Sequence, residues 1–301
     1  MASKAVAARR RRLAALLIGA AVAWFAARVL LAYPRVAAEA AAAAPAASAA
    51  ATIAPLLGPN DFAALGDRIG ADFGVTGDGV VAFAAGGALH ALAPGGRVQT
   101  IDLDGDPPES FVVDANGPML GIADGYLGLL GEDRRFGAAR PLPEAPMRLA
   151  PSVRPGVFYL SGGAAGDYRL YRFIDDGTLQ LLMGSREPIV DVADSARDVY
   201  AATASEILRI RAGEPEVLFH APDDDFGGPI RSLAVGQDDL VLFATDAKVY
   251  ALLGGAAISI VNDAGGTLRI RGDALYVLDP KRAILFTLRP ASSRLFEAAL
   301  K

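Results

Sequence analysis

The chain has 301 residues, of which 52% are hydrophobic and 21% are charged, and its formal net charge is −5. This balance argues against a nucleic-acid partner, because binding phosphates requires a basic surface. Cysteine is absent, which excludes disulfides and thiolate metal sites.

The N-terminal residues predict a membrane anchor. Residues 1–12 form a basic tail that ends in four arginines, and residues 13–33 are apolar with Arg28 as their only charge. A helix needs about 20 apolar residues to cross a bilayer, and basic residues before it stay in the cytoplasm. We therefore expect 13–33 to be a transmembrane signal-anchor in the cytoplasmic membrane. The rest of this single-pass chain would lie on the extracytoplasmic (periplasmic) side, with the membrane as a partner.

A cleaved signal peptide is the alternative reading of this segment. It has the same basic start with a shorter apolar run, and the triplet at 38–40, Ala-Glu-Ala, could be its cleavage site. Both readings export the remainder of the chain. A buried soluble helix fits poorly with four arginines at its start. Residues 34–60 are rich in Ala and Pro, which predicts a linker between membrane and domain.

From about residue 61 to 301 the chain reads as a repeat of short strands. Apolar runs with period-two alternation are separated by Gly, Asp, Asn and Pro turns. The second strands of the copies begin near Val80, Met119, Val157, Val199, Leu240 and Ala274. This spacing of roughly 40 residues is typical of four-stranded propeller blades. We predict an all-β, six-bladed β-propeller, with residues 69–297 supplying every strand; the alternative is a β-sandwich or barrel.

One copy carries a resemblance to known families. The stretch IRSLAVGQDDLVLFATDAKVYAL, residues 230–252, resembles the blades of the gluconolactonase, strictosidine-synthase and NHL-repeat propellers, and residues 189–208 fit the same pattern. The resemblance covers about three quarters of the chain and concerns the fold. It says little about function, because propellers serve as lactonases, receptors and scaffolds alike.

The first strand of each blade should line the central channel. Aligning the copies puts one residue of each blade at an equivalent inward position, and these residues are Asp72, Ser110, Arg148, Asp191, Ser232 and Arg269. We expect Arg148 to pair with Asp191, and Arg269 with Asp72, because an unpaired buried charge is costly. Such a ring would hold the blades in register and repel a divalent cation.

The resemblance also implies an enzymatic alternative. Gluconolactonase-like enzymes hold a divalent metal with a Glu, two Asn and an Asp on inner strands. Here Asn116 is expected in a turn and Asn262 in a connection, so only the aspartates could bind a metal. The two histidines, His90 and His220, are expected in outer strands, at the surface or rim. A metal-dependent hydrolase with its site in the channel stays open as the alternative, with a divalent cation as its cofactor.

An acidic rim is expected on the face that carries the connections between blades. Its residues are Asp102, Asp104, Asp106, Asp223, Asp224 and Asp225, joined by Asp124, Asp167, Asp246 and Asp279 in the middle hairpins. These are ordinary turn residues, or a docking face for a cation, a basic peptide or a partner domain. The sequence thus favours an exported, membrane-tethered propeller that binds a protein or a small ligand, without a catalytic site, a bound metal or a cofactor.

Overall fold

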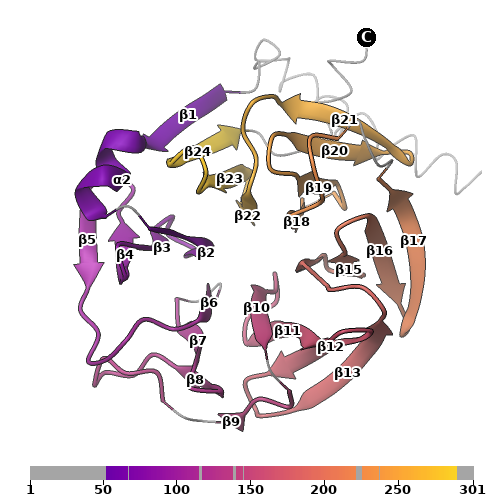
Figure 1. The fold of residues 1–301 in the computed structure, drawn as a ribbon, viewed down its shortest axis with the longest axis horizontal. Coiled ribbons are helices and arrows are strands. Elements are labelled where there is room, and N and C mark those ends of the chain that lie inside the picture. Colours follow the sequence, from indigo (N-terminus) through magenta and orange to yellow (C-terminus); the bar gives the residue numbers. More distant parts are fainter. Residues whose placement is uncertain are drawn as a thin grey trace, which may run out of the picture. The chain divides into compact units, whose positions relative to one another are not determined.

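The computed structural model describes residues 52–66, 68–114, 117–137, 140–144, 146–221, 226–236 and 238–289. In these residues, twenty-four strands form six four-stranded antiparallel sheets. Figure 1 shows the sheets arranged around one axis, with strands such as β2, β6, β10, β18 and β22 nearest the centre. The predicted all-β, six-bladed propeller is confirmed.

Blades 1 to 3 follow each other along the chain. Blade 1 is β2 (Ile69–Val75), β3 (Val81–Ala85), β4 (Ala88–Leu92) and β5 (Val98–Ile101). Blade 2 is β6 (Ser110–Val113), β7 (Met119–Ala123), β8 (Tyr126–Leu129) and β9 (Arg140–Pro141). Blade 3 is β10 (Met147–Pro151), β11 (Val157–Ala164), β12 (Asp167–Ile174) and β13 (Leu179–Ser185).

Blades 4 to 6 complete the circle. Blade 4 is β14 (Asp191–Asp194), β15 (Val199–Ala202), β16 (Glu206–Arg211) and β17 (Glu214–His220). Blade 5 is β18 (Ser232–Val235), β19 (Val241–Ala244), β20 (Val249–Leu253) and β21 (Ala256–Val261). Blade 6 takes β22 (Thr267–Arg271), β23 (Ala274–Asp279) and β24 (Ile284–Arg289) from the C-terminal end, and β1 (Thr52–Leu57) from the N-terminal end. The second strands begin within one residue of the predicted positions.

The closure of blade 6 corrects two predictions. Strand β1 pairs antiparallel with β24, from Thr52 opposite Arg289 to Leu57 opposite Leu285. Residues 69–297 therefore do not supply every strand, and the predicted linker, 34–60, overlaps β1 and the start of helix α2 (Pro59–Leu65). The physical reason is closure of the propeller. A strand from the N-terminal end of the described chain covers the outer edge of blade 6, and this joins the N-terminal part of the propeller to the C-terminal part. A lone apolar stretch next to an Ala-rich segment gives no repeat signal.

The core lies between neighbouring blades. Each of the six interfaces holds its own cluster of buried side chains, from the pair of blades 1 and 2 to the pair of blades 6 and 1. Helix α2 joins the last of these through Phe62, which packs edge-on against Phe83. Because successive residues of a strand point to opposite faces, inner strands that are buried at every position, such as β6 and β18, place buried side chains on both sides of their sheets.

Blade 2 departs most from the regular pattern. Its outer strand β9 has only two residues, and an isolated bridge from Leu130 to Phe136 extends the pairing of β8. Gly128 lies against Gly137, where an added Cβ would be 1.4 Å from the Gly137 carbonyl oxygen. Only glycine at position 128 allows this approach.

The predicted tail, anchor and most of the linker, residues 1–51, lie outside the described residues. Among the helices that are described, none has the length and apolarity required to span a bilayer.

Candidate functional site

The inner strands β2, β6, β10, β14, β18 and β22 surround the channel (Figure 1). Each starts at the face that carries the connections from one blade to the next and the turns between second and third strands, here called the upper face. Each ends at the opposite, lower face. Residues near the start of an inner strand therefore lie at the upper mouth of the channel.

A repeated hydrogen bond identifies equivalent positions in the blades. Ser110 Oγ accepts from the Leu149 N–H at 3.1 Å, and Ser232 Oγ accepts from the Leu268 N–H at 2.9 Å. Asp191 Oδ2 accepts from the Leu233 N–H at 3.0 Å. In each case the donor is the buried residue that follows the equivalent position in the next blade. The ring of equivalent positions is Asp72, Ser110, Arg148, Asp191, Ser232 and Thr267.

Thr267, and not Arg269, occupies the ring position of blade 6. The Thr267 hydroxyl donates to the Ala71 carbonyl of blade 1 at 2.7 Å. Arg269 lies two residues further along β22 and points to the same side, one layer deeper in the channel. Thr267 and Arg269 face the same side of β22, so the alternation of the strand does not distinguish between them. The sequence prediction therefore placed Arg269 at the ring position, two residues too far along the strand. The other five predicted residues occupy the ring.

Arg269 fits because its neighbours in that layer are small. The residues two positions past the ring are Ala150, Ala193 and Ala234 in blades 3 to 5, which leaves room for a long side chain. Its side chain is 8% exposed and forms an ion pair with Asp191 at 3.3 Å. It also donates to the carbonyls of Phe73 and Leu268, at 3.2 and 2.7 Å, and its guanidinium lies 5.8 Å from the Phe73 ring centroid.

The ion pairs differ from those expected. Arg269 of blade 6 pairs with Asp191 of blade 4, and neither an Arg148–Asp191 nor an Arg269–Asp72 pair occurs among the described residues. The deeper position of Arg269 is the reason, because its guanidinium reaches across the channel and not to the adjacent ring position. Blades 4, 6 and 1 are therefore joined through one buried arginine.

The carboxylate of Asp191 is already engaged by other donors of the channel. Asp191 Oδ2 accepts from Ser232 Oγ, the Leu233 N–H and Arg269, and Oδ1 accepts from its own strand at the Val192 N–H. A metal ligand needs free carboxylate lone pairs, which this aspartate has given to other donors. Within the described residues, no group of three or more His, Asp or Glu side chains could hold a metal ion.

A cavity of about 270 Å³ lies at the upper mouth. Charged groups of both signs line it, and they are Asp72, Arg148, Asp191, Arg231, Asp246, Arg269, Asp279 and Lys281. Arg269 also lines a smaller cavity of about 50 Å³ below. The buried arginine thus separates the upper part of the channel from the lower part.

Most of the charges in the upper cavity neutralise one another. Asp246 binds Arg231 through two hydrogen bonds of 3.0 and 3.1 Å and Lys281 at 2.8 Å. Burial opposes the ionisation of Asp246, but these two cations outweigh it and lower the pKa of this carboxyl. Asp279 pairs with Arg282 at 2.8 Å.

Two charged groups of the cavity lack such a match. Asp72 and Arg148 form no ion pair or side-chain hydrogen bond with any residue that the structure describes. Asp72 is half-buried and Arg148 is exposed. They occupy ring positions in blades 1 and 3, on either side of Ser110 in blade 2.

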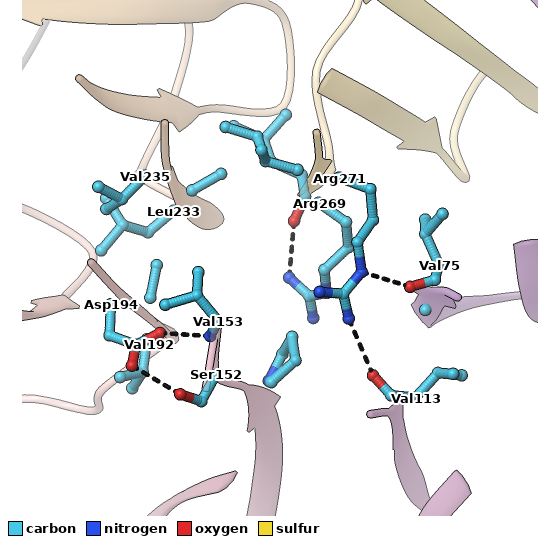
Figure 2. Close-up of a pocket in the computed structure, with 16 residues that line it drawn as sticks. Val75, Val113, Ser152, Val153, Val192, Asp194, Leu233, Val235, Arg269 and Arg271 are labelled. Atoms are coloured by element: carbon cyan, nitrogen blue, oxygen red, sulfur yellow. Dashed lines mark hydrogen bonds between the residues drawn. The ribbon is translucent and has the colours of Figure 1, made fainter. Parts of the chain in front are cut away.

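At the lower end of the channel, hydrogen bonds connect neighbouring blades. Figure 2 shows Arg271 donating to the carbonyls of Val75 and Val113, at 2.6 and 3.5 Å, in blades 1 and 2. Burial, helped by the positive charge of Arg269, lowers the pKa of Arg271.

Asp194 performs a similar role between blades 3 and 4. It accepts from Ser152 Oγ at 2.6 Å and the Val153 N–H at 2.8 Å (Figure 2). Tyr159 Oη and the Arg154 guanidinium each donate to it at 3.0 Å. Burial and the adjacent carboxylate raise the pKa of Tyr159. Sequence analysis missed this cluster because it treated only one layer of the channel.

The rim aspartates carry less free negative charge than the sequence implies. Arg134 pairs with Asp102 and Arg135 pairs with Asp104, both at exposed positions. The two arginines come from the turn after β8, which folds back over the connection between blades 1 and 2. Asp223, Asp224 and Asp225 lie outside the described residues, whereas Asp106 lines a surface hollow beside Asp104.

Neither histidine lies in the channel. His90 of β4 is buried, which corrects the expected surface position, and its ring nitrogens contact the Ala85 carbonyl at 3.1 Å and Thr100 Oγ1 at 3.3 Å. His220, at the end of β17, is exposed and lies 3.3 Å from Glu206. Both are explained by local contacts.

No protein-family model matches the sequence, and no curated protein matches it. Solved structures do match. A gluconolactonase from Xanthomonas campestris has a TM-score of 0.60 at 16% identity, over 81% of this chain and 93% of that protein. A luciferin-regenerating enzyme has a TM-score of 0.56 at 11% identity, over 79% and 95%. A virginiamycin B lyase from Staphylococcus aureus has a TM-score of 0.54 at 13% identity, over 72% and 79%.

At these identities the likeness concerns the fold alone. It confirms the resemblance that the repeat suggested, and the chain shares its β-propeller fold with the gluconolactonases.

Proposed function

We propose that the chain is an exported, membrane-tethered propeller that works as a binding module, with its ligand site in the upper cavity. Binding sites are concave and combine shape with a few well-placed polar groups. The upper cavity has about 270 Å³ of space and a charged lining to which the ring positions contribute Asp72, Arg148 and Asp191.

The observation that carries this proposal is the saturation of Asp191. Its carboxylate accepts hydrogen bonds from Ser232 and Leu233 of blade 5 and pairs with the buried Arg269 of blade 6. This aspartate acts as a structural link between blades 4, 5 and 6, whereas a hydrolase of the gluconolactonase kind would need it as a metal ligand. With Asp191 engaged in this structural role, we favour binding over metal-dependent hydrolysis.

The location rests on the sequence. The basic tail, 1–12, and the apolar segment, 13–33, favour an anchor in the cytoplasmic membrane with the propeller on the periplasmic side. The pairing of Asp102 and Asp104 with arginines lowers the negative potential of the rim. We therefore favour a small ligand in the cavity over a basic peptide on the rim.

Melting curves with and without Ca²⁺ or Zn²⁺ test this proposal against the metal-dependent hydrolase. We expect no metal-dependent increase of Tm in the wild type, because a ligand stabilises a protein only if it binds the native state. We also expect no hydrolysis of aldonolactones in the presence of either metal. An increase of Tm that disappears in Asp191→Asn would overturn the proposal and restore the hydrolase.

A further inference from the structure

The two unmatched charges of the upper cavity point to the chemistry of its ligand. Of the eight charged groups that line the cavity, six find an opposite charge within the described residues. Asp72 and Arg148 are the exceptions. They carry opposite charges and line the same cavity, yet they do not pair with each other.

We propose that the upper cavity binds a small zwitterion of the amino-acid class, with its carboxylate on Arg148 and its ammonium on Asp72. This proposal rests on the proposed binding function and names the ligand for it. Guanidinium and carboxylate form paired, charge-assisted hydrogen bonds, and a carboxylate accepts several bonds from an ammonium group.

The surrounding charges favour such a ligand over a dication or a dianion. The Arg269–Asp191 and Arg282–Asp279 pairs are neutral, so they neither attract nor repel a net charge. Asp246 is shared by two cations, Arg231 and Lys281, which adds a positive field on the side of blades 5 and 6. A dication would be repelled by this field. A dianion would leave one carboxylate facing Asp72.

The positions of Asp72 and Arg148 in the ring support a ligand that contacts both of them. Ser110 separates the two unmatched groups, and its hydroxyl already accepts from the Leu149 N–H. The ring at this point therefore offers a negative group, a small neutral residue and a positive group in successive blades. A ligand with separated opposite charges spans this arrangement.

The experiment measures binding by calorimetry to the full chain in detergent. The probes are ω-amino acids of two to six carbons, the monocarboxylates and monoamines of matched length, and 1,5-diaminopentane and glutarate. We expect at least one ω-amino acid to bind about tenfold more tightly than its two single-charge analogues. Arg148→Gln and Asp72→Asn should each remove this advantage. Arg97→Gln, an exposed arginine at the β4–β5 turn on the lower face, is the matched control and should leave it unchanged.

Any of three results would overturn the assignment of a zwitterionic ligand. The first is tightest binding by 1,5-diaminopentane or glutarate. The second is no binding of any ω-amino acid up to about 10 mM. The third is binding that neither variant weakens. The metal-dependent melting curves are independent of these probes, so a failure of the binding-module proposal is distinguishable from a failure of the ligand assignment.

Discussion

At the scale of single residues, buried carboxylates at both ends of the channel connect neighbouring blades. Asp191 links blades 4, 5 and 6 near the upper face, and Asp194 links blades 3 and 4 near the lower face. They are the first and last residues of the same four-residue strand, β14. A short inner strand with a carboxylate at each end thus holds its neighbours at two heights.

Replacing Asp194 by Asn should destabilise the propeller. The amide keeps one acceptor but turns a donor toward Ser152, Tyr159 and Arg154, so at least one hydrogen bond in a buried site is lost. The expected loss is about 1–3 kcal/mol of unfolding free energy, measured by urea denaturation. Asp273→Asn, at an exposed turn, should change it by less than about 0.5 kcal/mol. Equal effects of the two variants would contradict the role of Asp194.

Asp246 should make the stability depend on acid pH. Its pKa is lowered in the folded chain, so its ion pairs stabilise fully above the unfolded-state value of about 3.9 and are lost as pH falls through the folded value. Asp246→Asn should therefore cost about 1 kcal/mol at pH 7 and almost nothing below pH about 3. Denaturation midpoints of both proteins across this range check the sign; a difference that grows on acidification would contradict it.

At the scale of residues, the sequence indicated which side chains face the channel but not which of them form ion pairs. Aligning the inner strands groups Ser110, Asp191 and Ser232, which all accept the same kind of hydrogen bond from the next blade. The partner of Arg269 was assigned wrongly, since a shift of two residues keeps the side chain inward and changes only its depth. Periodicity determines which side a residue faces, and it carries no information about height along the channel.

At the scale of elements, the closure of the propeller depends on β1. The strand adds the outer edge of blade 6 and brings Leu57 into the cluster shared by blades 6 and 1. The sequence predicted the second strand of every blade within one residue, because each follows a turn rich in Gly, Asp or Asn. It missed β1, since closure joins distant parts of the chain and leaves no mark in the local repeat.

Two substitutions in β1 test the closure. Leu57→Ala removes a buried side chain at the blade interface and should cost about 2–5 kcal/mol. Ile53, which is 53% exposed in the same strand, is the matched control, and Ile53→Ala should cost less than about 0.5 kcal/mol. Chemical denaturation measures both. If Leu57→Ala is as mild as the control, β1 does not close the propeller in solution.

At the scale of the whole molecule, the topology prediction concerns where the propeller works. The four arginines before the apolar segment, 13–33, should hold the N-terminus in the cytoplasm. A reporter enzyme that is active only outside the cytoplasm, fused after Lys301, should then be active. Replacing Arg9 to Arg12 by glutamates should reduce that activity. Activity of a cytoplasm-specific reporter at the same position would contradict export.

The channel axis is where the whole ring is tied together, because Arg269 contacts blades 4, 6 and 1 at once. Arg269 and Asp191 should not contribute equally to the free energy of unfolding. Asp191→Asn leaves a buried guanidinium without its carboxylate and places an amide donor against the Leu233 N–H, and the expected cost is about 3–5 kcal/mol. Arg269→Met leaves Asp191 with three other donors and keeps the channel filled, so a cost of about 1–2 kcal/mol is expected.

Urea denaturation of both single variants and of the double variant measures this asymmetry. The double variant should cost less than the sum of the single variants, since the guanidinium that Asp191→Asn strands is no longer present. If Arg269→Met costs as much as Asp191→Asn, the arginine and not the carboxylate holds the blades. If the costs simply add, the ion pair does not couple blades 4 and 6 across the axis.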